Sequence, residues 1–132
     1  MVIDTSALIA ILFGEPEAEF FAKAIANDPK RLISAFNVLE TAIVIEAKKG
    51  ESGAHEFDLL LNCTEIKIVP MNRKQFQLAR LAWKTYGKGR HPAGLNIGDC
   101  CSYSLAKLVG QPLLFKGDDF SKTDIPRILS EA

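Results

Sequence analysis

The sequence predicts an α/β domain in which helices cover both faces of a parallel sheet. Two observations lead to this fold class. Short apolar runs with the composition of buried strands alternate with longer segments of helical periodicity along the whole chain. The chain has 132 residues, of which 48% are hydrophobic, so residues 1–132 are expected to form one domain with a substantial core.

The first half of the chain is expected to begin with a strand and to place helices before and after a second strand. Strands are expected at residues 2–4 and 31–34. Helices are expected at residues 7–13 and 18–26, between these strands, and at 37–49 and 55–62, after them. The strands are short apolar runs rich in Val, Ile and Leu, which fit a buried pleated surface. Pro16 is tolerated at a helix start. Gly50 is expected to end the helix at 37–49, because glycine readily takes the left-handed conformation that closes helices.

The second half is expected to contain two more strands with two helices between them. Strands are expected at residues 66–69 and 112–115. Between them, helices are expected at residues 73–86 and 95–108, joined by a loop at 87–94. Asn72 is suited to cap the first of these helices, and Gly110 to close the second. Trp83 lies on the apolar face of its helix and is expected in the core. The tail from residue 125 is expected to add a short strand or a helical turn.

Cysteine and histidine usage argues against several kinds of site. The three cysteines, Cys63, Cys100 and Cys101, are an odd number with two adjacent, which is a poor disulfide framework and indicates the reducing cytoplasm. The two histidines, His55 and His91, are far apart and no CxxC pair is present, so a zinc site is not expected. The sequence shows neither a signal peptide nor an apolar run of about 18 residues, so no membrane association is expected.

Charge is unevenly distributed along a chain whose net charge is zero. Residues 66–98 contain no Asp or Glu but carry the cationic residues Lys67, Arg73, Lys74, Arg80, Lys84, Lys88 and Arg90. Such an asymmetry favours a polyanionic partner. The alternative is that these side chains only solvate one helix face and a loop.

Acidic residues are expected to gather at one edge of the sheet. Asp4 ends the first strand, and Glu40 and Asp99 lie near the starts of helices that return from the sheet. Asp118 and Asp119 follow the last strand. With right-handed crossovers, all these positions fall at the carboxyl edge, where open parallel sheets place their chemistry.

Carboxylates that converge without basic partners repel one another, and a divalent cation relieves that repulsion. Oxygen ligands alone favour Mg²⁺ or Mn²⁺. Such a centre activates water and supports phosphodiester hydrolysis. Each acid also has a simpler reading as a helix cap, a residue that favours a helix N-terminus, or a turn former.

Four segments in this order make the chain resemble PIN-domain ribonucleases, specifically VapC-type toxins of toxin–antitoxin pairs. They are VIDTSAL at 2–8, LETA at 39–42, GRHPAGLNIGDC at 89–100 and LLFKGDDF at 113–120. The resemblance implies a three-layer α/β/α sandwich with a mainly parallel sheet of four to five strands. It also implies a cytoplasmic endoribonuclease that depends on Mg²⁺ or Mn²⁺ and is inhibited by a VapB-type antitoxin. A homodimer or a toxin–antitoxin hetero-oligomer is implied, with operator DNA bound only through the antitoxin.

The resemblance also assigns roles to individual acids. Asp4 and Asp99 match the principal metal ligands, and Glu40 matches a third acid that acts directly or through a bound water. Asp119 is favoured as the fourth acid, with Asp118 as the neighbouring candidate. Ser6 matches a small hydroxyl residue near the site, and as a residue it is suited to cap the first helix and orient an acid or a water.

Basic residues beside the acids are expected to hold RNA phosphates. Lys88, Arg90 and His91 precede the helix of Asp99, and Lys116 lies beside the last strand. Trp83, if it is not in the core, or Tyr86 could stack on a base.

Three other functions fit parts of the pattern. An aspartyl phosphatase needs a second Asp two residues after Asp4, where Ser6 stands. A phosphorylated receiver domain needs an acid after the third strand, where Pro70, Met71 and Asn72 follow instead. An inactive PIN scaffold has no positive support, since the expected acids are present.

Overall fold

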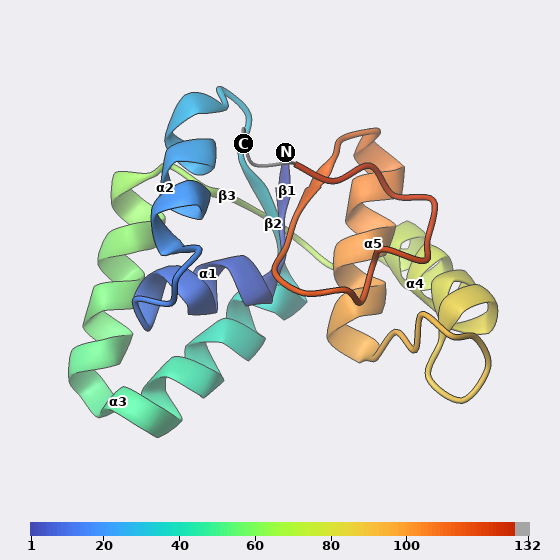
Figure 1. Ribbon diagram of the computed structural model, residues 1–132, viewed down its shortest axis with the longest axis horizontal. Helices are drawn as coiled ribbons and strands as arrows, with labels where there is room; N and C mark the ends of the chain where they lie inside the picture. The colour runs from blue at the N-terminus through green and yellow to red at the C-terminus, as the bar shows by residue number, and fades with distance from the viewer. Residues whose placement is uncertain (129–132) are drawn as a thin grey trace.

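The computed structural model describes residues 1–128, which form a three-layer α/β/α sandwich (Figure 1). One parallel sheet has the strand order β3-β2-β1-β4. Its strands are β1 (Val2–Ile3), β2 (Leu32–Ser34), β3 (Lys67–Val69) and β4 (Leu113–Leu114). The α/β prediction is confirmed, with four strands. Within residues 125–128 of the tail, Arg127 forms an isolated bridge with Leu113.

Five helices cover the two faces of this sheet. They are α1 (Thr5–Leu12), α2 (Ala18–Asn27), α3 (Ala35–Cys63), α4 (Arg73–Tyr86) and α5 (Ile97–Val109). Figure 1 shows α1, α2 and α3 on one side of the sheet and α4 and α5 on the other. None of these helices is both long and apolar enough to cross a membrane, as far as residues 1–128 are concerned.

The two helices expected at 37–49 and 55–62 are both present, and they meet within α3 at a kink. Gly50 has the non-helical backbone angles φ 62° and ψ −153°, so one helical segment ends there and a second begins directly after it. Gly53 makes this tight bend possible, because an added Cβ would lie 2.8 Å from a methyl of Ile45. Gly50 therefore ends the first helical segment, as expected, and the second segment begins earlier than residue 55.

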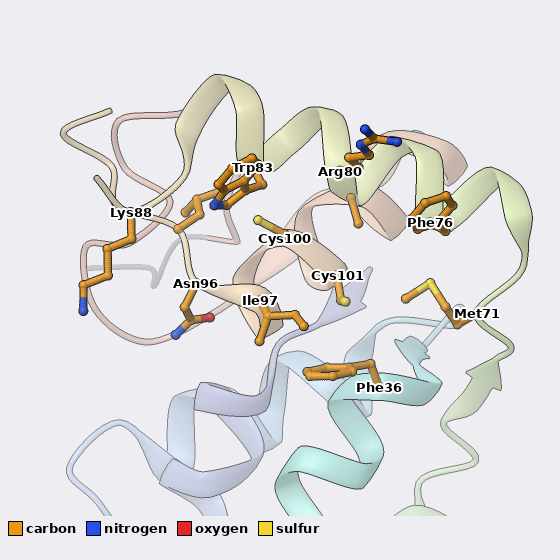
Figure 2. A pocket seen from close by; sticks show the side chains of 12 residues that line it. Phe36, Met71, Phe76, Arg80, Trp83, Lys88, Asn96, Ile97, Cys100 and Cys101 are labelled. Carbon is orange, nitrogen blue, oxygen red and sulfur yellow. The ribbon is translucent and has the colours of Figure 1, made fainter. Parts of the chain in front are cut away.

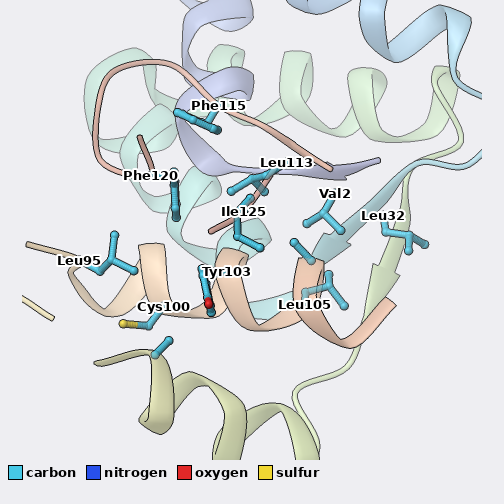
Figure 3. Close-up of a cluster of buried hydrophobic side chains, with 12 residues drawn as sticks. Val2, Leu32, Leu95, Cys100, Tyr103, Leu105, Leu113, Phe115, Phe120 and Ile125 are labelled. Carbon is cyan, nitrogen blue, oxygen red and sulfur yellow. The ribbon is translucent and has the colours of Figure 1, made fainter. Parts of the chain in front are cut away.

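The core has two parts, one on each face of the sheet. Successive strand residues point to opposite faces, so Val2 packs towards α4 and α5 while Ile3 packs towards α1, α2 and α3. Leu113 and Leu114 divide in the same way. Figure 3 shows the first part, where Val2 and Leu113 face side chains of α5. Burial on both faces explains why these strands read as continuous apolar runs.

Trp83 lies outside this core, contrary to the sequence-based expectation. Its side chain is 42% exposed, whereas the neighbouring Ala82 is buried against α5. Helix α4 approaches α5 through small residues, Ala79 and Ala82, which leave no space between the helices for an indole. Three large apolar side chains of α4, Phe76, Leu81 and Trp83, therefore face outward.

Arg31 ties two helix ends together. Its guanidinium donates to the carbonyls of Ile25 at 2.6 Å, Thr64 at 2.5 Å and Ala26 at 3.3 Å. Arg31→Ala is expected to lower the free energy of unfolding by roughly 2–3 kcal/mol, because charge-assisted hydrogen bonds to the carbonyl ends of α2 and α3 are lost. Urea unfolding with an unchanged m-value measures this. Lys30→Ala removes an exposed neighbouring cation and serves as control; an equal loss in both variants would contradict the role of Arg31.

Candidate active site

Asp4 is fixed at the point where β1 gives way to α1. It is the N-cap of α1, and its Oδ2 accepts from the amide of Ser6 at 3.0 Å and from the Ser6 hydroxyl at 2.6 Å. The other oxygen, Oδ1, accepts from the hydroxyl of Ser102 on α5 at 2.5 Å. The side chain is only 5% exposed, and burial raises the pKa of Asp4 above its usual range despite these hydrogen bonds. Asp4 is therefore both the cap and a buried acid, and Ser6 does not cap α1.

Glu40 reaches the same edge from α3. This helix begins at Ala35, capped by Ser34, so Glu40 lies in its second turn. Its Oε1 accepts from the hydroxyl of Thr5 at 2.6 Å. The carboxylate lies against Gly98 at the start of α5, where an added Cβ would be 2.6 Å from Oε2. Glycine at position 98 is thus what admits the Glu40 carboxylate.

Asp99 lies in the first turn of α5. Its Oδ2 accepts from the amide of Asn96 at 3.0 Å, while the Asn96 side chain accepts from the Asp99 amide at 2.9 Å, which completes a capping box. Asp99 is 7% exposed. Burial, followed by the charges of Asp4, Asp119 and Glu40, raises the pKa of Asp99 to about 7. Asp4, Asp119 and Glu40 therefore lie near enough to Asp99 for their charges to act on it.

The two acids after β4 differ in their relation to this cluster. Both side chains are exposed, but only the charge of Asp119 acts on the pKa of Asp99. The next residue, Phe120, is buried and packs edge-on against Phe115, with ring centroids 4.8 Å apart. That aromatic anchor sets where Asp119 lies, which favours Asp119 over Asp118 as the fourth acid.

Four residues that support the acids were not predicted from the sequence. They are Thr5, Asn37, Gly98 and Ser102. The buried Asn37 side chain donates to the Thr5 hydroxyl at 3.2 Å and to the Gly98 carbonyl at 3.2 Å, which connects α1, α3 and α5. The available signals were the proximity of Thr5 to Asp4 and the helical spacing of Ser102 from Asp99.

The chemistry of these residues fits a divalent cation. Within residues 1–128, none of Asp4, Glu40, Asp99 or Asp119 forms an ion pair with Lys or Arg. Buried acids without a basic partner, here Asp4 and Asp99, are relieved by an oxygen-binding cation. In the same described range, no three Asp, Glu, His or Cys side chains are already gathered closely enough to hold a metal ion. Binding would therefore require side chains of the cluster, among them the exposed Asp119, to move closer to the ion.

The predicted RNA-binding residues have different surroundings. The Arg90 guanidinium lies 4.2 Å above the Trp83 ring, and the Lys88 side chain is exposed. The His91 ring packs edge-on against Tyr86, at 5.0 Å between centroids, and its Nδ1 accepts from the amide of Ala93.

Lys116 is committed to other contacts. Its ammonium lies 3.1 Å from a Glu15 oxygen and 2.9 Å from a Glu17 oxygen. Hydrogen bonds to Glu17 and Glu15 raise the pKa of Lys116. Lys116 thus fastens the loop after β4 to the segment before α2, and is not a free cation at the edge of the acids.

An apolar groove of about 560 Å³ opens beside the acids, between α4 and the beginnings of α3 and α5. Figure 2 shows Trp83 and Phe76 on α4 across from Phe36 on α3, with Asn96 and Ile97 close to the start of α5. Two further lining residues are Cys100 and Cys101, and burial raises the pKa of both thiols to about 11. Thiols with a pKa this high stay protonated near neutral pH, the form in which cysteine is a poor nucleophile.

The arrangement matches a known protein family. The model of the PIN domain matches residues 1–126. The chain belongs to the PIN-domain family. Within residues 1–128, this PIN domain has its acids at the carboxyl edge of the sheet, as the motifs led us to expect.

Relatives place this PIN domain among the VapC proteins. It is 56% identical over 128 residues to Ribonuclease VapC of Mycolicibacterium smegmatis, covering 97% of this chain and 99% of that protein. It has the same identity to Ribonuclease VapC30 of Mycobacterium tuberculosis, covering 97% and 98%. The resemblance inferred from the four motifs is therefore confirmed.

Solved structures share the fold at low sequence identity. The PIN domain aligns with Mycobacterium tuberculosis VapC20, described as a sarcin-ricin loop cleaving toxin, with a TM-score of 0.77 at 17% identity over 96% of this chain and 97% of that chain. A toxin–antitoxin complex from Klebsiella pneumoniae gives a TM-score of 0.72 at 18% identity, covering 93% and 92%.

Proposed function

We propose that this PIN domain is the endoribonuclease toxin of a VapBC toxin–antitoxin pair and that it cleaves RNA with Mg²⁺ or Mn²⁺. The observation that carries the proposal is that the charges of Asp4, Glu40 and Asp119 act on Asp99 with no Lys or Arg paired to these acids within residues 1–128, in a chain 56% identical to Ribonuclease VapC. Asp4 and Asp99 are the proposed principal ligands, with Glu40 and Asp119 completing the site. When bound, the divalent ion supplies charge for the phosphodiester oxygens and lowers the pKa of water.

The protein's own groups prepare the site for that ion. The hydroxyls of Ser6 and Ser102 hold the Asp4 carboxylate, and the hydroxyl of Thr5 holds Glu40. The capping box holds Asp99 at the start of α5. Because these supports come from separate elements, Asp4, Glu40 and Asp99 are positioned by the fold, whereas Asp119 lies in the loop after β4.

The basic segment is proposed to bind the RNA strand near the acids. Arg90 stacked on Trp83 combines a cation with an aromatic surface, and Lys88 adds an exposed charge. Phosphate contacts and base stacking are what single-stranded RNA offers such residues. His91 is proposed as a weaker contributor, and a contact from Lys116 would require its ion pairs with Glu15 and Glu17 to break.

A VapB-type antitoxin is the proposed partner, either with a toxin homodimer or within a hetero-oligomer. One fold neighbour is VapBC2 from Rickettsia felis bound to a DNA fragment from its promoter, at a TM-score of 0.69. The exposed Leu39 and Ile43 on α3, together with the apolar groove, leave surface for protein partners. Operator DNA is proposed to bind only through the antitoxin, and the three free cysteines support a cytoplasmic setting.

The test is cleavage of total RNA by the purified protein with Mn²⁺ or Mg²⁺, beside EDTA and beside Asp4→Asn. Discrete fragments that require both the metal and Asp4 are expected. Asparagine keeps an acceptor for the amide of Ser6, so α1 retains its cap while the carboxylate charge is lost. Cleavage that survives EDTA, or that Asp4→Asn performs at the wild-type rate, would refute the proposed site. End mapping of the fragments identifies the RNA target.

Metal affinity is expected to rise with pH between 6 and 8. Asp99 has a pKa of about 7 in the metal-free protein, and the ion binds the deprotonated carboxylate. Below that pKa a proton competes with the ion for the carboxylate. As the pH rises towards 7, the apparent Kd for Mn²⁺ is therefore expected to fall by up to about tenfold per pH unit, and above pH 7 it levels off. Calorimetric titration in buffers of different ionisation enthalpy measures both the Kd and the proton released. A Kd that does not change from pH 6 to 8 would contradict this assignment.

A further inference from the structure

Ser102 uses its hydroxyl in a way that differs from a close neighbour on the same helix. Both Ser102 and Ser104 are fully buried on α5. Ser104 donates within its own helix, to the carbonyl of Cys101 at 3.0 Å, as helical serines commonly do. Ser102 instead donates out of the helix to Oδ1 of Asp4, so its hydroxyl links α5 to the end of β1.

The hydrogen bonds around Asp4 leave its two oxygens unequal. Oδ2 accepts from both the amide and the hydroxyl of Ser6, which uses both lone pairs of that oxygen. The Ser6 hydroxyl itself accepts from the amide of Lys116 at 2.9 Å, so its single proton is directed at Asp4. Oδ1 of Asp4 accepts one hydrogen bond, from the Ser102 hydroxyl. Within residues 1–128, the second lone pair of Oδ1 accepts no hydrogen bond.

Ser102 also lies one helical turn beyond Asp99. Residues three apart occupy the same face of a helix, so the face of α5 that carries Asp99 also carries the hydroxyl that holds Asp4. The bond from Ser102 therefore sets the separation between β1 and α5 at the level of the two acids. If the carboxylate binds an ion through its one remaining lone pair, the direction of that lone pair matters. A hydrogen-bond partner that fixes the rotation of the carboxylate group sets this direction.

We propose that Ser102 is a positioning residue for the metal centre, which directs Oδ1 of Asp4 towards the ion and fixes its distance from Asp99. This inference rests on the proposed metal-dependent function. Ser102 does not contact the RNA or the ion in this role; it acts through Asp4.

The experiment compares Mn²⁺ binding by the wild type, Ser102→Ala, Ser102→Thr and Ser104→Ala, using calorimetry at pH 8 without RNA. Ser102→Ala is expected to raise the Kd for Mn²⁺ by roughly 10–100-fold, the usual effect of removing a group that orients a metal ligand. Ser102→Thr keeps the hydroxyl and is expected to restore most of the affinity. Ser104→Ala removes an equally buried hydroxyl that contacts no acid, and is expected to leave the Kd within about twofold.

The outcomes separate this inference from the function on which it rests. If the wild type binds Mn²⁺ and cleaves RNA while Ser102→Ala binds with unchanged affinity, the positioning role is overturned and the nuclease remains. If Ser104→Ala weakens binding as much as Ser102→Ala, the effect is general packing and the inference is again overturned. If the wild type binds no Mn²⁺, the metal-dependent function itself fails. Thermal melting of the metal-free variants verifies that each is folded before titration.

Discussion

Asp99→Asn is expected to raise the Tm of the metal-free protein at pH 8 and to abolish the further rise in Tm that Mn²⁺ causes in the wild type. Asp99 is 7% exposed, and its pKa in the folded state, about 7, lies above the usual 3.8. Its contribution to stability is therefore fully present below about pH 4 and is lost as the pH rises through 7. At pH 8 the folded protein carries a buried charge, which asparagine removes.

The expected rise is about 5 °C, together with a loss of RNA cleavage of more than about 100-fold. Differential scanning fluorimetry from pH 5 to pH 9, with and without Mn²⁺, measures the change in Tm. The difference in Tm between Asp99→Asn and the wild type should increase with pH and be smallest near pH 5. Asp58→Asn, at an exposed position on α3, is the control and should not change Tm with this pH dependence. A lower Tm for Asp99→Asn at pH 8, or a retained response to Mn²⁺, would contradict the metal assignment.

Gly98→Ala is expected to keep the fold and lose activity. Alanine favours helices more than glycine does, so α5 itself is not weakened. However, its Cβ would lie 2.6 Å from Oε2 and 2.7 Å from Oε1 of Glu40, so the carboxylate must move. We expect the rate of RNA cleavage to fall by roughly 10–100-fold, as when a supporting contact of a metal centre is lost.

A second substitution tests this cause. Glu40→Asp shortens the acid, and in the double variant Gly98→Ala/Glu40→Asp it makes room for the added methyl. If displacement of Glu40 explains the loss, the two substitutions are not additive, and the double variant is less impaired than the product of the single effects. Simple additivity, or wild-type cleavage by Gly98→Ala, would show that the close approach of Glu40 has no catalytic consequence.

The principal acids could be located from the sequence because only local pattern and parallel topology were required. Asp4 follows a β-branched run, and Asp99 follows a helix cap, so both fall at the carboxyl edge once the strands are parallel. The supports could not be located in this way. A serine within an apolar helix does not reveal whether its hydroxyl turns inward, as Ser104 does, or reaches another element, as Ser102 does.

Trp83 and Lys116 show two other limits of the sequence. The helix of Trp83 is apolar on more than one side, and which side faces the sheet depends on the small residues that let α5 approach. Lys116 looked available for RNA because its partners, Glu15 and Glu17, are a hundred positions away along the chain. Periodicity carries no information about such distant pairs.

The strand order also determines when the centre exists during synthesis. β1 lies between β2 and β4, and Val2 is paired with Leu113. The first strand to leave the ribosome therefore waits for the last before its pairing is complete, and Asp119 emerges later still. Contacts so distant along the chain form late in folding. During synthesis, the carboxylate centre therefore cannot assemble until the segment that carries β4 and Asp119 has left the ribosome.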